Sequence, residues 1–265
     1  MRLVMPRRIA IFSLIALLGV IAVAQSKDFW QAKDYKQWTE KECKKLLENS
    51  PWAQDYTLKQ VYIETLQSAS APAGTLNPAS LPREGPSTGE RERAPKTQMI
   101  YQVQLRSALP IRQAIVRRQM IAEQYEQMAP EKKREFEERA GKFLSADFNE
   151  TVMVHVSYNA SVKSYDRDLA MYWHGQTTET LKNTTFLIAS NGEKIVPTQY
   201  TASTGAGREF QLIFPRQVNG EPLIGPKDKS IKIEFKHPRV GNEGEARVLL
   251  EFKADKMMIN NKVVY

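Results

Sequence analysis

The stretch TVMVHVSY, residues 151–158, decides the fold class of this chain. Its valines and its tyrosine occupy every second position, and Met153, His155 and Ser157 lie between them. Such alternation is typical of a strand that buries one face and exposes the other. We therefore expect His155 to point outward from the strand and to be solvated.

Similar segments precede and follow this strand. The alternating residues 99–105 predict a half-buried strand, and residues 56–66 have the β-branched and aromatic content of another. Further strands are predicted at 186–189, 194–196, 210–214, 231–235 and 248–252. Many short strands separated by turn signals favour an α+β protein built on an antiparallel β-sandwich, immunoglobulin-like or related.

Two dipeptides predict hairpin turns. Asn191-Gly192 lies between two predicted strands, and both of its residues accept the positive φ angles of a tight turn. Asn260-Asn261 predicts a last small hairpin within residues 257–264.

Helices are predicted in three places. Thr39-Glu40-Lys41-Glu42 is a capping box, which starts a helix that should end near Glu48. The apolar stripe of this helix includes Cys43, the single cysteine of the chain, as a small core residue. A helical pair is expected at about 110–144, where Pro110 opens the first helix, Pro130 ends it and residues 131–144 form the second. Two short helices are expected at 165–173 and 179–182.

Three arginines on the first helix of this pair admit two interpretations. Arg112, Arg117 and Arg118 could form an anion-binding patch. A solvated helix face is the favoured interpretation, because charge runs on helices usually face water.

The first 24 residues predict a cleavable signal peptide for export. Three arginines precede an apolar run over residues 9–23, and Ala22-Val23-Ala24 places small residues where signal peptidase cleaves, before Gln25. The run is shorter than the roughly 20 residues of a membrane-spanning helix. An uncleaved N-terminal anchor is the alternative, and otherwise the membrane is met only during export.

The remaining chain divides into three parts. Residues 25–67 form a tryptophan-rich helical segment that leads into the first strand, and residues 98–265 form the main β-rich domain. Between them, residues 68–97 are rich in proline, glycine and serine, which predicts a flexible loop. Without the signal arginines, 35 basic residues face 30 acidic ones. This mild charge, on an exported chain, gives no reason to expect a nucleic-acid partner.

The residues that carry chemistry show no familiar catalytic pattern. The three histidines, His155, His174 and His237, have no second metal ligand at close spacing, so no metal or other cofactor is expected. Asp166 and Asp168 precede His174 on one predicted helix, and an aspartate–histidine set can perform acid–base chemistry. A surface turn is the favoured interpretation, because no nucleophile motif accompanies these residues.

The tryptophan-rich segment carries the one resemblance to known proteins. Phe29-Trp30, Trp38-Thr39-Glu40-Lys41-Glu42, Lys45-Leu46-Leu47 and Ser50-Pro51-Trp52 resemble the start of a family of exported bacterial proteins of unknown function. The similarity extends through Ser107-Ala108-Leu109-Pro110-Ile111-Arg112 and into the C-terminal strands. The resemblance implies export and a related fold organisation, and it implies no activity.

Two functional hypotheses follow. The first is a non-catalytic binding module, secreted or of the periplasm or cell envelope, whose partners are envelope proteins or polymer. Its candidate binding residues are Trp30, Trp38 and Trp52, although a structural anchoring role is favoured for them. The alternative is a secreted or periplasmic enzyme of unfamiliar type, with its site near Asp166, Asp168 and His174.

Overall fold

The computed structural model describes residues 28–58, 98–241 and 244–265. The predicted signal, its Ala24–Gln25 cleavage site and the predicted loop 68–97 lie outside the described residues. Among the helices that are described, none combines the length and hydrophobicity that crossing a bilayer requires.

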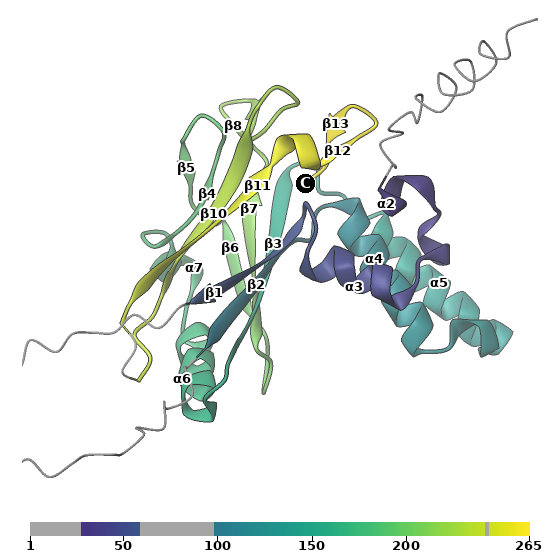
Figure 1. The fold of residues 1–265 in the computed structure, drawn as a ribbon, viewed down its shortest axis with the longest axis horizontal. Coiled ribbons are helices and arrows are strands. Elements are labelled where there is room, and N and C mark those ends of the chain that lie inside the picture. The colour runs from purple at the N-terminus through teal and green to yellow at the C-terminus, as the bar shows by residue number, and fades with distance from the viewer. Residues whose placement is uncertain (1–27, 59–97, 242–243) are drawn as a thin grey trace, which may run out of the picture.

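Two antiparallel sheets form the main body of the structure (Figure 1). The first has the strand order β1-β2-β3-β7-β6 and the second the order β11-β10-β4-β5. Their strands are β1 (Ala53–Leu58), β2 (Met99–Leu105), β3 (Thr151–Ala160), β4 (Thr185–Ile188), β5 (Lys194–Ile195), β6 (Gln199–Ala202), β7 (Glu209–Pro215), β10 (Ser230–His237) and β11 (Ala246–Lys253). Two small hairpins are formed by β8 (Gln217–Val218) with β9 (Glu221–Pro222) and by β12 (Met258–Ile259) with β13 (Lys262–Val263). The predicted α+β class with antiparallel strands is therefore confirmed.

Aromatic side chains connect the inner faces of the two sheets. The ring of Tyr101 on β2 lies 5.0 Å from that of Phe235 on β10, and Phe210 on β7 lies 6.1 Å from Phe235. All three side chains are buried. Alternation along each strand places such residues on one face, and the core forms where the two apolar faces meet.

A helical layer lies against one end of the first sheet (Figure 1). It contains α2 (Phe29–Ala32), α3 (Glu40–Glu48), α4 (Leu109–Ala122) and α5 (Pro130–Leu144). Elsewhere α6 (Lys163–His174) packs on β3, and α7 (Thr178–Leu181) precedes β4. Short 3-10 helices span Tyr35–Gln37, Tyr125–Gln127 and Ala254–Lys256. The pair α4–α5 is an insertion between β2 and β3.

The predicted capping box starts α3. Glu42 N–H donates to Thr39 Oγ1 at 3.2 Å, and Thr39 N–H donates to Glu42 Oε2 at 2.9 Å. These bonds satisfy two amides that a helix start would otherwise leave unpaired. Cys43 on the apolar stripe is fully buried, and burial raises the pKa of its thiol to about 11. This thiol is therefore a core group at neutral pH.

The tryptophans of the N-terminal segment hold it against the rest of the protein. Trp38 and Trp52 are buried, and Trp30 packs edge-on against Trp52 with ring centroids 5.7 Å apart. Trp52 Nε1–H donates to the carbonyl oxygen of Val264 at 2.6 Å. The Nε–H of Arg117 on α4 donates a hydrogen bond to the carbonyl oxygen of Trp38 at 2.8 Å. Trp38 and Trp52 act as anchors and leave little surface for a partner.

The first strand begins earlier than predicted. Residues 56–66 were expected to form it, whereas β1 starts at Ala53. A tight turn after α3 explains the difference, since Ser50 N–H donates to the Ala53 carbonyl at 2.9 Å. Burial of Trp52 inside this turn leaves the chain extended from the next residue. The residues of the prediction beyond Leu58 lie outside the described part of the chain.

The hairpin at Asn191-Gly192 forms, but not through two residues of positive φ. Strands β4 and β5 pair around it, and Gly192 has a φ of +90°. Asn191 has no positive φ, and its Oδ1 accepts from Glu193 N–H at 2.9 Å. Gly192 N–H donates to Ala189 O at 2.9 Å, so a turn of ordinary hand precedes one left-handed glycine.

The anchoring role of Trp38 can be measured. Trp38→Ala should lower the free energy of unfolding by about 3–5 kcal/mol, because it leaves a large cavity between the N-terminal segment and α4. Urea titration followed by far-UV circular dichroism measures this change. Met171→Ala, at a side chain that is 68% exposed, is the control and should stay within about 0.5 kcal/mol of wild type. Equal midpoints for the two variants would contradict the anchoring role.

Candidate functional site

An open groove lies between α4 and the outer face of the first sheet. We call it the α4 groove, and its volume is about 440 Å³. Its wall on the sheet includes Gln102, Arg106, His155 and Glu209, and its wall on the helix includes Arg118. Leu47 of α3 and Ile115 of α4 add apolar surface. The groove thus combines charged, amide and apolar groups.

Strand register brings these distant residues together. Ser157 on β3 lies beside Gln102 on β2 and beside Glu209 on β7. Two residues away on β3, His155 lies between Gln104 of β2 and Gln211 of β7. Because side chains alternate, these residues share the face opposite the aromatic core.

Arg106 follows β2 directly and is held at the groove by its backbone and by Gln104. Its N–H donates to the Met153 carbonyl at 2.8 Å, and its Nε–H to Gln104 Oε1 at 3.4 Å. Gln104 is itself fixed, because its Nε2 donates to the Leu47 carbonyl at 2.7 Å. The terminal guanidinium nitrogens of Arg106 have no hydrogen-bond partner among the described residues, and no described carboxylate lies within 4.0 Å.

The charge of Arg106 is therefore only partly compensated. Burial lowers the pKa of its guanidinium, and the negative charge of Glu209 acts in the opposite direction. Arginine nevertheless stays protonated in proteins, so Arg106 presents a cation with free donors to the groove.

His155 is buried, which corrects the expectation that it is solvated. Its side chain is only 3% exposed, although it lies on the outer face. Position explains this burial, because β3 is the central strand and the long side chains of Arg106 and Glu209 lie beside the ring. Burial, and then the charge of Arg106, lower the pKa of His155 to about 3. The ring is therefore neutral at pH 7, and its Nε2, 3.3 Å from Glu209 Oε2, makes a polar contact and not an ion pair.

A second hollow continues the α4 groove toward α5. Its volume is about 380 Å³, and it shares Arg106, Ile115 and Gln119 with the first. Helix α5 contributes Arg139 and Phe143. The two hollows form one concave surface along α4, and the name α4 groove covers both from here on.

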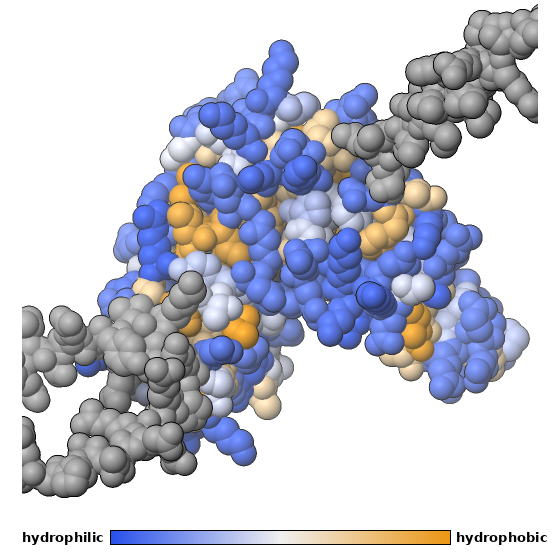
Figure 2. Space-filling view, viewed as in Figure 1, coloured by the Kyte–Doolittle hydropathy of each residue, from blue (hydrophilic) through white to orange (hydrophobic). Residues whose placement is uncertain are grey.

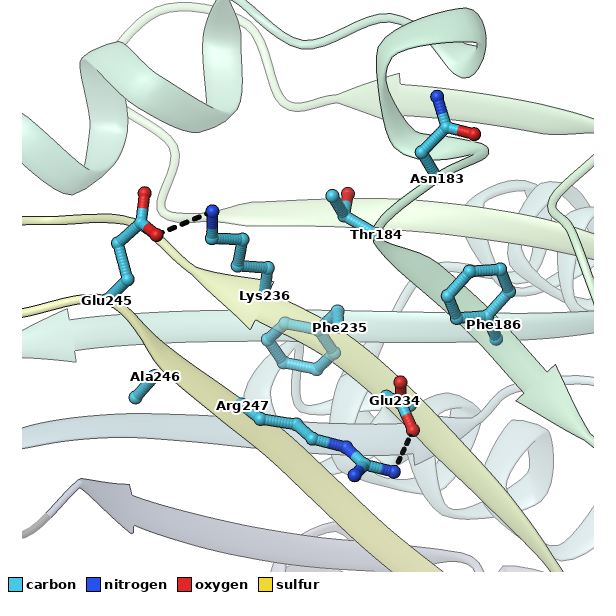
Figure 3. A pocket seen from close by; sticks show the side chains of 9 residues that line it. All are labelled: Asn183, Thr184, Phe186, Glu234, Phe235, Lys236, Glu245, Ala246 and Arg247. Atoms are coloured by element: carbon cyan, nitrogen blue, oxygen red, sulfur yellow. Dashed lines mark hydrogen bonds and ion pairs between the residues drawn. The ribbon is translucent and has the colours of Figure 1, made fainter.

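A separate pocket of about 360 Å³ lies on the second sheet (Figure 3). Its charged groups pair with one another, since Lys236 contacts Glu245 at 2.6 Å and Arg247 contacts Glu234. Lys194 also reaches Glu234, at 3.0 Å. Burial raises the pKa of Glu234, but the bonds from Lys194 and Arg247 outweigh it and hold that pKa below its ordinary value. Such a paired surface offers a ligand no unsatisfied charge.

The structure does not bring the predicted acid–base residues together. Asp166 accepts a hydrogen bond from Arg208 Nε at 2.8 Å, and His174 is exposed at the end of α6. Eight residues separate them along the helix, a rise of about 12 Å. Asp168 is half-buried, and no hydrogen bond or ion pair joins any two of the three among the residues described.

His237 occupies a buried polar cluster that the sequence did not single out. Tyr101 Oη accepts from Trp173 Nε1–H at 3.3 Å and lies 2.8 Å from His237 Nδ1. The indole can only donate, whereas the direction of the bond between Tyr101 Oη and His237 Nδ1 depends on the tautomer of the histidine. That Nε2 is buried without a partner in the described structure. Burial lowers the pKa of His237 to about 4.

The three arginines of α4 do not form one solvated face. Arg112 is buried, and its Nη1 donates to the carbonyls of Phe143, Leu144 and Ala146 at 2.7–3.1 Å. The carbonyls of Phe143 and Leu144 belong to the last turn of α5, so Arg112 caps that helix. Of the three, only Arg118 is exposed.

No cluster of three or more histidine, cysteine or acidic side chains suited to a metal ion occurs in the described ranges. Comparisons with protein-family models, with curated proteins and with solved structures found no match to this chain. The resemblance to exported bacterial proteins stays a prediction.

One signal in the sequence pointed to the α4 groove. Gln102, Gln104 and Arg106 alternate with the buried residues of β2, which marks a polar outer face. Nothing in the sequence showed that His155 and Glu209 would join them, because their association depends on strand order.

The two buried histidines predict acid sensitivity. Their folded-state pKa values, about 3 for His155 and about 4 for His237, lie below the ordinary value of 6.5. Below pH 6.5 the unfolded chain binds more protons than the folded one, so stability is complete above pH 6.5 and is lost as the pH falls. Each histidine should contribute a slope of about 1.4 kcal/mol per pH unit at most.

Denaturant titrations between pH 7 and 4 test this dependence. His237→Gln should reduce the slope between about pH 6 and pH 4, whatever its effect on absolute stability. A His237→Gln variant that keeps the full wild-type slope would contradict the assignment.

Proposed function

We propose that this chain is an exported, non-catalytic binding module built on an immunoglobulin-like β-sandwich, and that it binds its partner in the α4 groove. The observation that carries the proposal is Arg106, a half-buried cation with free donors inside a concave surface.

Strand order supports the immunoglobulin-like part of the proposal. Strands β2-β3-β7-β6 follow the order A-B-E-D of that fold, and β11-β10-β4-β5 follow G-F-C-C′. Strand β1 adds an edge strand beside β2. The aromatic contacts between the inner faces fit two sheets packed face to face.

Donors that have no partner within the described protein support binding at the α4 groove. The terminal nitrogens of Arg106 are not buried, so a ligand can reach them and form charge-assisted hydrogen bonds. The pocket on the second sheet lacks this feature because its charges are already paired. Figure 2 shows a mostly hydrophilic face with separate apolar areas, so a polar groove distinguishes the candidate site better than hydrophobicity does.

Residues 1–24 support export, because their composition fits a signal peptide. The partner class that this proposes is a protein or polymer of the periplasm, cell envelope or medium.

Export predicts a defined mature chain. Expression with the full leader should give protein that begins at Gln25, as measured by intact-mass spectrometry of the exported fraction. Ala24→Leu should leave the leader attached, because signal peptidase requires a small residue at that position. Uncleaved wild-type protein would show that the leader stays as an anchor.

The groove itself can be tested by site-specific photo-crosslinking in the native host. A benzophenone amino acid in place of Gln119, an exposed residue that lines the groove, should capture one reproducible partner. The same substitution at Leu249, which is 38% exposed on β11, is the matched control and should not capture it. Equal capture at the two positions, or none at Gln119, would contradict binding in the groove.

A further inference from the structure

The charges along the α4 groove are unbalanced. Arg106, Arg118 and Arg139 line its two hollows, and none of them forms an ion pair with a described residue. His155 is neutral, so Glu209 is the single carboxylate that lines the groove within the described residues. The net charge of the lining is therefore positive.

Other acidic groups near the groove are already engaged. Asp55 accepts from Gln102 Nε2 at 3.2 Å, and Glu123 accepts from Gln119 Nε2 at 2.6 Å. Neither lines the groove. These bonds use amide donors of Gln102 and Gln119 and leave their amide oxygens as acceptors.

The lining matches a peptide with acidic side chains. Carboxylates suit the planar, forked donors of arginine, and the amide oxygens of Gln102 and Gln119 suit peptide N–H groups. Ile115 and Leu47 provide apolar surface for the aliphatic parts of such a chain. A phosphate ligand would use the cations but neither of these other features.

We propose that the α4 groove binds an acidic peptide segment of a partner protein, with Arg106 as the main carboxylate-binding residue and Arg118 and Arg139 at the rim. This inference rests on the proposed binding function and names the partner class for the same site.

Fluorescence anisotropy with a labelled hexaglutamate peptide tests the inference on the mature protein. Wild type should bind it and should not bind hexaglutamine, and added salt should weaken the binding. Arg106→Gln should weaken binding about tenfold or more, because it removes the partly buried cation. Glu209→Gln should strengthen binding several-fold, because it removes the competing carboxylate.

Two further variants separate binding from folding. Arg118→Gln changes an exposed side chain, so it should leave folding intact, and it should weaken binding by a smaller factor than Arg106→Gln. Arg247→Gln, in the paired pocket of the second sheet, is the control and should bind like wild type.

Absence of hexaglutamate binding would overturn the inference, including the case in which inorganic phosphate binds and the peptide does not. Equal losses of binding in Arg106→Gln and Arg247→Gln would overturn it as well. A partner captured at Gln119 without hexaglutamate binding would keep the binding module and reject the acidic-peptide class. Failure of both experiments would reject both proposals.

Discussion

The packing of Tyr101 between the two sheets is the interaction on which the other elements depend. Its ring contacts Phe235 of the opposite sheet, and its hydroxyl is bonded to Trp173 of α6 and to His237 of β10. One side chain therefore contacts strands of both sheets and a helix. Burial raises the pKa of Tyr101, so the hydroxyl stays protonated and the bonds stay neutral. A neutral network avoids the desolvation cost of a buried ion pair.

With one face of the first sheet committed to that core, its outer face is left with polar residues and is covered by helices at one end. Arginines tie that cover together: Arg117 bonds to the Trp38 carbonyl, and Arg112 caps α5. Each of these bonds fixes a helix of the cover. Arg106 differs in its place, because it lines the α4 groove, whereas neither Arg112 nor Arg117 does.

Local sequence patterns predicted where the helices and strands lie better than they predicted which side chains are buried. Alternation located β3, β7, β10 and β11, and the capping box located α3, because these signals depend on neighbouring residues. The burial of His155 and Arg112 could not be read in the same way. It depends on what packs above them, and their coverings come from residues tens of positions away. The α4 groove has the same origin, since Arg106, His155 and Glu209 meet only through the order of β2, β3 and β7.

The bond between Trp52 and Val264 joins residues that are 212 positions apart. A chain that emerges from a ribosome or a translocation channel with its N-terminus first offers Trp52 long before Val264 exists on the same side. The bond that fixes the Trp52 indole is therefore a late contact of high sequence separation. Until Val264 is in place, the indole N–H of Trp52 lacks the acceptor that it has in the folded protein.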